Sequence, residues 1–531
     1  MKYTIGIDYG TLSCRALVMN AETGETLGGS ECGYTVYDKA LPTGEKLPDR
    51  AALADPAEYL QALEKVVHEA IANAHIDPKD VAGIAVDTTS MSLVSCDQNG
   101  TPLCMQEKWK REPLAYIRMW KSYTATKAAE DIGRMAKEKR TSFLAACGGN
   151  PSSEGAYPKL LETLRKNPEL YNEIDVALDL HEWLAWVLTG KMQRSMNTMG
   201  MKNYCADGKT LPSGDFWRSI DERFENVNDK LRGDVLSWGE RAGELTEEMA
   251  DKLGLPAGIA VASCALDGHA PMMALGLKES GDAMMTIGTS GVLCVISDHH
   301  EAIDGICGQS FSGLVPGFYG YDFAQSGVGD MFGWFVDNCV PGKYERMAAE
   351  KGISVHQLLS EMGFAKPVGE SGLVAVDWWN GSRSIVVDQT LTGVITGMKL
   401  STKPEDIYRA LVEAAAFGMR AMRDALEDKG VKVNRICVCG GIAAKNPLLL
   451  QCYADILGSE LRLSTLPNSA AAGAAIAAAA AAGAYPTLPD AMDALSSREF
   501  KRVTPDMQRH AQYEALYEKY KKLRKFFGEN K

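Results

Sequence analysis

The chain begins MKYTIGIDYGTLSCRALVMN (residues 1–20). Residues 3–7 and 15–19 both have the composition of β-strands, and a short Gly/Thr/Ser turn joins them. The pattern predicts a β-hairpin. A plain hairpin needs no carboxylate at its turn, yet Asp8 ends the first strand and Gly10 follows it. We therefore expect the turn to have a functional role in addition to joining the two strands.

The same pattern returns in DAMMTIGTSGVLCVIS (282–297), which again reads apolar strand, Gly-Thr-Ser turn, apolar strand. Two such hairpins, each opening one half of the chain, indicate an internally duplicated architecture. A third glycine segment lies in VNRICVCGGIAAKNPLLLQCYADILG (433–458). There we expect a buried strand that meets two glycines and continues into a helix.

Length and composition limit the class of protein. A chain of 531 residues is too long for one hydrophobic core, which predicts two domains or three. The net charge of −13, without a dense Lys/Arg block, argues against a nucleic acid or anionic membrane as partner. No run approaches the roughly 20 apolar residues of a membrane span. The longest, residues 470–482, is mostly alanine, and we expect it to form a structural, closely packed helix.

Cysteine and histidine do not form a metal pattern. The 13 cysteines and 8 histidines are scattered, and no C-x-x-C occurs. Free thiols in a reducing cytosol are the simplest interpretation, so a cytoplasmic location is expected.

Other segments give a coarse outline of the two halves. Residues 80–97 predict a strand, a polar loop and a second strand, and residues 177–190 predict a helix ended by Gly190. The segment GIAVASCALDGHAPMMALGL (258–277) predicts a buried strand, then Asp267, then a helix. The end of the chain, rich in Lys, Glu and Tyr, predicts an exposed C-terminal helix.

The glycine turns suggest a phosphate site. Phosphates bind where backbone N–H groups converge and small side chains leave room. One such turn is usually only a hairpin, but two in the same context, with a Gly-Gly helix entry, favour a nucleotide's phosphate tail. The G-x-x-x-x-G-K-[ST] loop is absent, as is G-x-G-x-x-G at a strand–helix start. The nucleotide hypothesis therefore depends on the paired hairpins.

Long segments of the chain resemble one enzyme family, the FGGY carbohydrate kinases of the actin-like ATPase superfamily. The similar segments are GIDYGTLSCRAL (6–17), RMWKSYTA (118–125), PSSEGAYPKLL (151–161), ICGQSFSGLVPGFYGYDFAQSGVGDMFGWF (306–335), DWWNGSRS (377–384), LTGVITGMKLST (391–402) and ICVCGGIAAKNPLLLQCYADIL (436–457). Together they cover nearly the whole chain, and their length makes chance agreement implausible.

The resemblance implies an α/β fold of two actin-like (ribonuclease-H-like) domains with an interdomain cleft, each with a mixed five-stranded sheet. Residues 1–278 would be the sugar-binding domain and residues 279–531 the ATP-binding domain. The implied reaction transfers the γ-phosphoryl group of ATP to a ketopentose, first of all L-ribulose, as in arabinose catabolism. D-ribulose and xylulose are the alternatives. The partner would be a small sugar, and a homodimer is one option for the assembly.

The resemblance also implies roles for the nucleotide side. Asp8 would help to hold Mg²⁺, through water. Gly10 and Thr11, together with the second turn, would flank the ATP phosphates. The remaining residues implied near the nucleotide are Gly288, Thr289, Ser290, Gly440, Gly441 and Asn446.

On the sugar side, the resemblance makes Asp267 the catalytic aspartate. It would accept the proton of a sugar hydroxyl, and the N-terminus of the following helix would keep its carboxylate ionised. Trp120, Lys121 and Lys202 match positions near the sugar. Asp322 also matches such a position, although GYDFAQ has this aspartate where the family members that the chain resembles most have glutamate. This shorter side chain, and a departure in the loop 87–95, leave the choice of sugar open.

Each assignment has a simpler alternative. Asp267 could be only a helix N-cap, and Asp8 could satisfy only turn N–H groups. Trp120 could be a packing residue, and Gly440 and Gly441 could serve only strand–helix packing. Two other classes share the phosphate hairpins. A chaperone-type ATPase would need a further peptide-binding β-domain, and a filament-forming actin-like protein would not need the sugar-side residues.

Overall fold

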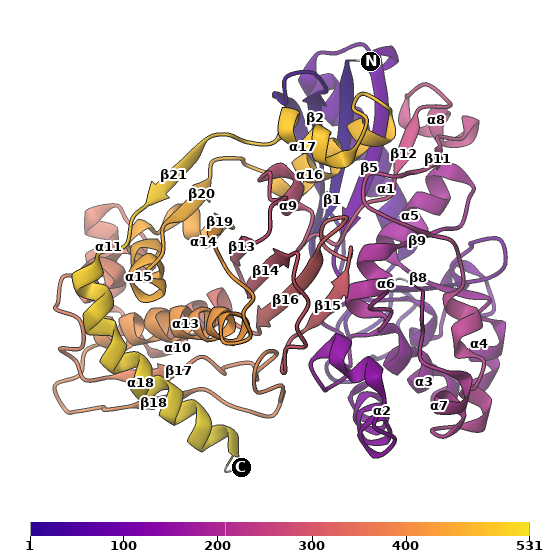
Figure 1. The fold of residues 1–531 in the computed structure, drawn as a ribbon. Coiled ribbons are helices and arrows are strands. Elements are labelled where there is room, and N and C mark those ends of the chain that lie inside the picture. The colour runs from indigo at the N-terminus through magenta and orange to yellow at the C-terminus, as the bar shows by residue number, and fades with distance from the viewer. Residues whose placement is uncertain (1, 208, 530–531) are drawn as a thin grey trace. The chain divides into compact units, whose positions relative to one another are not determined.

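The computed structural model describes residues 2–207 and 209–529 and contains two compact units (Figure 1). Unit 1 holds the chain up to Lys278, with Gly308–Gly320 and Leu466–Arg498. Unit 2 holds Glu279–Cys307, Tyr321–Thr465 and the chain from Glu499 on. Two segments from the second half of the sequence thus pack within unit 1. The functional division into 1–278 and 279–531 stays a prediction.

Unit 1 contains a six-stranded sheet, a four-stranded sheet, the two-stranded pair β9–β10 and the helices around them. Its strands are β1 (Tyr3–Tyr9), β2 (Ser13–Asn20), β3 (Thr26–Gly33), β4 (Leu53–Ala54), β5 (Val81–Thr88), β6 (Leu93–Cys96), β7 (Ile117–Arg118), β8 (Val176–Asp179), β9 (Arg194–Ser195), β10 (Val235–Leu236), β11 (Arg241–Glu244), β12 (Ala260–Ala262) and β15 (Gly308–Phe311). Its α-helices are α1 (Pro56–Ala74), α2 (Thr126–Glu138), α3 (Ala156–Lys166), α4 (Pro168–Glu173), α5 (Leu180–Thr189), α6 (Met196–Lys202), α7 (Gly214–Arg218), α8 (Glu247–Leu253), α9 (Pro271–Ala274), α16 (Ser469–Ala481) and α17 (Leu488–Leu495).

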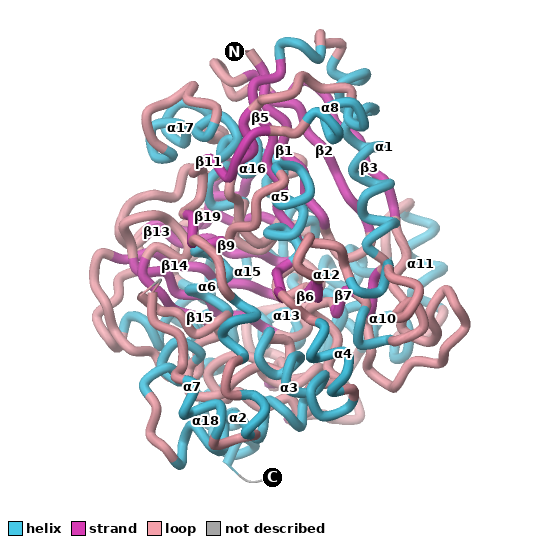
Figure 2. The backbone as a smooth tube through the Cα atoms, turned by 90° about the vertical axis from the view of Figure 1, so that its right-hand side faces the viewer, coloured by secondary structure: helices cyan, strands magenta, loops and turns pink. Residues whose placement is uncertain are grey.

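The larger sheet of unit 1 has the strand order β11-β12-β5-β1-β2-β3. The predicted hairpin is present, because β1 pairs antiparallel with β2. Strand β5 runs parallel to both β1 and β12. Side chains alternate between the two faces of a strand, and Ile5 and Ile7 share one buried cluster with Leu63 of α1 and Leu184 of α5. Helix α1 lies along β2 and β3 (Figure 2).

The alanine-rich helix α16 packs on β1 and β5 (Figure 1). Gly6 makes this approach possible, because a Cβ there would lie 1.8 Å from the carbonyl oxygen of Ala471. Gly83 of β5 does the same with Ala478 at 2.9 Å. The structural role expected of this helix is confirmed, and its small side chains explain why the sheet backbone can come so near.

Replacing Gly6 by alanine should destabilise the protein strongly. The added methyl group meets helix backbone rather than a flexible side chain, so strand and helix must separate, at a cost of about 3 kcal/mol in the free energy of unfolding. Chemical denaturation measures this change. Gly33→Ala is the control, because a Cβ there has an ordinary 3.7 Å contact with Leu12. Equal stability of the two variants would contradict the packing described.

A smaller antiparallel sheet completes unit 1, with the order β4-β7-β6-β8. Strand β8 takes the first residues of the predicted helix 177–190, so that prediction began too early. The helix α5 starts at Leu180 because Asp179 and Glu182 form a capping box, and Gly190 ends it in the left-handed conformation as expected.

Unit 2 contains one large sheet and a helical layer. Its strands are β13 (Asp282–Ile287), β14 (Gly291–Ser297), β16 (Tyr319–Gln325), β17 (Val374–Val376), β18 (Val394–Thr396), β19 (Arg435–Cys439), β20 (Leu461–Ser464) and β21 (Phe500–Val503). Its α-helices are α10 (Gly329–Cys339), α11 (Lys343–Lys351), α12 (Val355–Phe364), α13 (Pro404–Glu427), α14 (Gly441–Lys445), α15 (Pro447–Leu457) and α18 (Met507–Glu529).

The sheet of unit 2 repeats the topology of unit 1. Strands β16-β14-β13-β19-β20-β21 follow in this order, with a β13–β14 hairpin and β19 parallel to β13 and β20. The internal duplication predicted from the two hairpins is therefore present. The expected five strands are extended in both units by an antiparallel edge strand, β11 beside β12 and β21 beside β20.

The predicted C-terminal helix α18 is present, but it is exposed on only part of its surface. Tyr513, Leu516, Tyr517 and Tyr520 are buried on one of its faces, and the helix packs against β17, α13 and α15. None of the described helices is long and apolar enough to cross a membrane.

Candidate active site

Three aspartates meet where parallel strands of unit 1 end. Asp8 of β1 and Asp87 of β5 are direct neighbours in the parallel ladder. Asp267 follows the next strand, and its backbone N–H donates to the carbonyl of Thr88 at 2.7 Å. Ligand sites in α/β sheets are commonly built at the carboxyl ends of parallel strands. The predicted Asp8 and Asp267 therefore belong to one carboxylate cluster, and Asp87 is its third member.

Burial dominates the electrostatics of this cluster. Asp87 is fully buried, and neither of its carboxylate oxygens has a hydrogen-bond donor among the described residues. Burial, and then the charges of Asp8 and Asp267, raise the pKa of Asp87 well above its ordinary value. Burial also raises the pKa of Asp8, although Arg15, 3.3 Å away, opposes this shift. Such a crowded set of oxygens favours a bound cation.

The surroundings of Asp267 differ from those predicted. It lies in a turn before the short helix α9, whose N-cap is Ala270, so Asp267 is not a helix N-cap. Its Oδ1 accepts a hydrogen bond from the N–H of Gly268 at 2.7 Å. Burial and the charge of Asp8 nevertheless raise the pKa of Asp267 to about 7. The helix N-terminus does not hold this pKa down, which corrects the expected reason for its basicity.

The first glycine turn is held by aromatic residues. The N–H of Gly10 donates to the carbonyl of Ser13 at 3.0 Å, and the hydroxyl of Tyr34 donates to the carbonyl of Gly10. Trp120 donates from Nε1 to the Oγ1 of Thr11 at 3.1 Å. The structure thus joins a residue predicted near the sugar to one predicted near the phosphates.

The two predicted lysines of unit 1 occupy different places. Lys121 follows Trp120 and is half-buried. Lys202 ends α6 and lines a small cavity with Met91 and Asp179.

Lys159 of α3 is a buried residue close to the segment that carries Trp120, and sequence reasoning did not single it out. Its ammonium group donates to the carbonyls of Met91 (2.6 Å), Arg118 (2.9 Å) and Met119 (3.2 Å). Burial and the charge of Arg118 lower the pKa of Lys159 to about 7, whereas three carbonyl acceptors match the three donors of the charged form. Lys159 ties the loop 87–95 to the segment that carries Trp120.

The second glycine turn repeats the first in unit 2. The N–H of Gly288 donates to the carbonyl of Ser290 at 3.0 Å. The chain after β16 holds this turn from one side, since Val328 donates to the carbonyl of Thr289 (2.9 Å) and Gly329 to that of Gly288 (3.0 Å). Gly288 does not have a positive φ, and a Cβ there would meet only Ser290, at 3.8 Å. The protein itself therefore leaves room for a side chain at this position.

The Gly-Gly segment between β19 and α14 has two different glycines. Gly440 has a φ of 108°, and a Cβ there would lie 2.4 Å from the carbonyl oxygen of Ile287, at the end of β13. This glycine serves close packing. Gly441 is exposed, with nothing within 4 Å of a Cβ. Asn446 caps α15 through the N–H of Leu449 (3.1 Å) and donates to the hydroxyl of Ser360 (2.8 Å).

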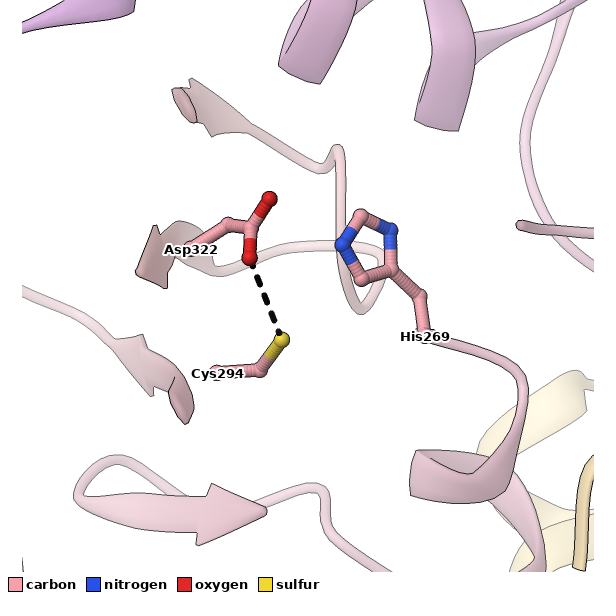
Figure 3. A group of neighbouring side chains, drawn as sticks. All are labelled: His269, Cys294 and Asp322. Carbon is pink, nitrogen blue, oxygen red and sulfur yellow. Dashed lines mark hydrogen bonds between the residues drawn. The ribbon is translucent and has the colours of Figure 1, made fainter. Parts of the chain in front are cut away.

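Asp322 lies within β16 of unit 2 and is buried. The thiol of Cys294 on β14 lies 3.8 Å from its Oδ1 (Figure 3). The backbone carbonyl of Asp322 accepts from the N–H of Cys307 at 2.9 Å. The other residues predicted near the sugar belong to unit 1.

Sequence reasoning missed three residues of unit 1: Asp87, Arg15 and Lys159. Asp87 had a usable signal, because IAVD at residues 84–87 ends an apolar strand in aspartate as IGID does at residues 5–8. The pairing of Arg15 with Asp8 follows from hairpin register, in which the two residues are direct partners. Lys159 gave no local signal, since its three acceptors come from two distant segments, the loop at Met91 and the chain at Arg118 and Met119.

Comparison with known proteins identifies the family. The FGGY family of carbohydrate kinases matches the chain in both of its domains, the N-terminal domain at residues 3–274 and the C-terminal domain at residues 283–482. The chain belongs to the FGGY family of carbohydrate kinases. It is a phosphotransferase that acts on a small sugar, and ATP is the donor that this family implies. Nothing in these matches supports the chaperone-type or filament-forming alternatives.

Curated relatives narrow the comparison. The chain is 38% identical to "Ribulokinase" of Bacillus licheniformis over 97% of this chain and 95% of the relative. It is 39% identical to "Ribulokinase" of Halalkalibacterium halodurans over 99% and 95%. Among solved structures it is similar to xylulose kinase from Rhodospirillum rubrum (TM-score 0.79, 21% identity, 99% of this chain and 98% of that one). Gluconate kinase from Lactobacillus acidophilus gives a TM-score of 0.82 at 18% identity, over 100% and 99%. These structures confirm the predicted two-domain α/β fold.

Proposed function

We propose that this protein phosphorylates L-ribulose to L-ribulose 5-phosphate with ATP. The name of the full-length relatives supports the choice of sugar, and the cluster of Asp8, Asp87 and Asp267 supports the chemistry. D-ribulose and xylulose are the alternative substrates within the family. A cytoplasmic location and a homodimer stay predictions.

In this proposal Asp267 is the catalytic base of unit 1. It orients the attacking hydroxyl and accepts its proton, a step for which a pKa near the working pH is suitable. The transition state of phosphoryl transfer is loose, so positioning and charge neutralisation contribute most. Accordingly, the protein needs a well-placed carboxylate rather than a strong base.

Asp8, with water, is proposed to help hold Mg²⁺. The buried oxygens of Asp87, which have no hydrogen-bond donor in the described part of the chain, fit this ion, because Mg²⁺ prefers carboxylate oxygen and water as ligands. When bound, the ion would neutralise charge on the phosphates. Arg15, paired with Asp8 and with Glu31, fixes the Asp8 carboxylate from the other side.

The remaining site residues keep their predicted roles as proposals. Residues 1–278 bind the sugar, through Trp120, Lys121 and Lys202, and residues 279–531 bind ATP. Asp322 is proposed to select the sugar. The phosphates and adenosine are assigned to Gly10, Thr11, Gly288, Thr289, Ser290, Gly440, Gly441 and Asn446. Of these, the exposed Gly441 has the open surroundings that a nucleotide needs.

A coupled ADP-release assay over pentuloses, polyols and hexoses tests the function. L-ribulose should give the highest kcat/KM, and excess chelator should abolish the activity because Mg²⁺ is removed. If another pentulose gives the highest kcat/KM, that pentulose is the substrate, and the protein remains a sugar kinase of this family. ADP release that does not depend on any sugar would overturn the proposal.

The same panel, run on Asp322→Glu, tests the role of Asp322. A site that hydrogen-bonds a substrate hydroxyl discriminates strongly against a misplaced one. Lengthening the side chain by one methylene should therefore change the ratio of kcat/KM between pentuloses. If every ratio stays at its wild-type value, Asp322 does not face the sugar.

A further inference from the structure

Buried polar contacts connect the C-terminal helix α18 to β16. The hydroxyl of Tyr520 donates to Oδ1 of Asp377 at 2.7 Å. The other oxygen of Asp377, Oδ2, accepts from Nε2 of Gln325 at 2.7 Å. All three side chains are at most 6% exposed. A buried carboxylate needs its donors, so each contact helps to fix the other.

Gln325 is held in place by the central helix α13. Its Nε2 also donates to the carbonyl of Ala415 at 2.9 Å. Gly418, one turn further on, leaves the space, since a Cβ there would lie 2.2 Å from this Nε2 and 2.6 Å from Oδ2 of Asp377. The glutamine is therefore positioned by two hydrogen-bond acceptors, Oδ2 of Asp377 and the carbonyl of Ala415, as well as by packing.

Gln325 also lies against Gly291, the first residue of β14 after the second glycine turn. Its Oε1 lies where a Cβ on Gly291 would be only 2.6 Å away, and Gly291 is the residue directly after the turn. The chain then runs from Gln325 to Val328 and Gly329, whose N–H groups donate to the carbonyls of the turn. A short segment thus links the turn to β16: Val328 and Gly329 hydrogen-bond to the turn, and Gln325 packs beside Gly291.

We propose that Tyr520 is a positioning residue for the phosphates of the nucleotide, acting through Asp377 and Gln325 on the turn formed by Gly288, Thr289 and Ser290. This inference rests on the proposed function, which places ATP phosphates at that turn. A small cavity lies beside Gln325, Asp377 and Tyr520 and has room for about one water molecule. On that side no atoms of the described residues fill the space next to the three side chains to hold them in place. Loss of the Tyr520 hydroxyl therefore lets Asp377 and Gln325 shift.

The test compares two variants of the same helix. Tyr520→Phe removes the hydroxyl that reaches Asp377. Tyr517→Phe is the matched control, because Tyr517 is also buried and donates to a carboxylate, Oδ2 of Asp424, at 2.7 Å. Both should lower the melting temperature by a similar amount. Only Tyr520→Phe should weaken binding of a non-hydrolysable ATP analogue, by about threefold to tenfold, with L-ribulose affinity unchanged in both.

A second variant keeps the test decisive if Tyr520→Phe folds poorly. Asp377→Asn still accepts from Tyr520 but presents an amide N–H₂ toward Gln325, and it should weaken nucleotide binding similarly. Gly288→Val serves as the reference for the turn itself. If Gly288→Val weakens nucleotide binding and neither other variant does, the role of Tyr520 is overturned and the proposed function stands. If Gly288→Val has no effect either, the phosphates do not bind at this turn, so the inference about Tyr520 fails, whereas sugar-dependent ADP release tests the proposed function separately.

Discussion

Asp267→Asn should lower sugar-dependent turnover by a factor on the order of 10² to 10⁴. The substitution keeps the size of the side chain and an oxygen that can accept from the N–H of Gly268, but it removes the charge and the basicity. A sugar hydroxyl is a poor nucleophile, and without the carboxylate it is neither aimed nor deprotonated. Steady-state turnover, melting temperature and ATP affinity are measured on the one variant.

The competing interpretation of Asp267 is a residue that only satisfies a turn N–H. In that case the variant should lose about 1 kcal/mol of stability or less and keep its turnover. Asp77→Asn is a matched control, since Asp77 accepts from the N–H of Lys79 in a short 3-10 turn. Near-normal turnover of Asp267→Asn would remove it from the catalytic role.

Gly288→Val should weaken ATP binding by about tenfold to a hundredfold while sparing the sugar. The described protein leaves room for a Cβ at Gly288, and its φ is not positive. The expected loss therefore comes from the phosphates that the side chain would meet, not from misfolding. Because the φ of Gly288 suits any residue, backbone strain is not a second explanation for a loss of ATP binding. Calorimetric titration with ATP and with L-ribulose measures both affinities.

A control in the same unit separates the site from general effects of the substitution. Gly342→Val is suitable, because a Cβ at Gly342 has nothing within 4 Å and its φ is negative. Its ATP affinity should equal that of the wild type. If Gly288→Val binds ATP within a factor of about two of wild type, the second hairpin is only a hairpin.

The duplicated framework could be predicted because its signals are local. Each hairpin consists of two short apolar runs around a glycine turn, so neighbouring residues determine the fold of that piece. Asp87 was missed because no glycine turn follows its strand. The place of α16 was also out of reach, since its contact with β1 joins Gly6 to Ala471 across most of the chain.

The buried face of the C-terminal helix could have been predicted from the spacing of its apolar and aromatic residues. Tyr513, Leu516, Tyr517 and Tyr520 are spaced at i, i+3, i+4 and i+7, the pattern of a helix with one buried face. The many charged residues around them suggested exposure instead. Lys159 is a different case, because a buried lysine among carbonyls follows from three-dimensional packing and not from any spacing in the sequence.

Phosphorylation of L-ribulose can be measured by incubating the purified protein with ATP, Mg²⁺ and L-ribulose and following ADP and the phosphorylated product together. We predict one ADP for each L-ribulose 5-phosphate formed, and almost no ADP without the sugar. ADP formed at the same rate with and without L-ribulose, and no phosphorylated sugar, would contradict the account.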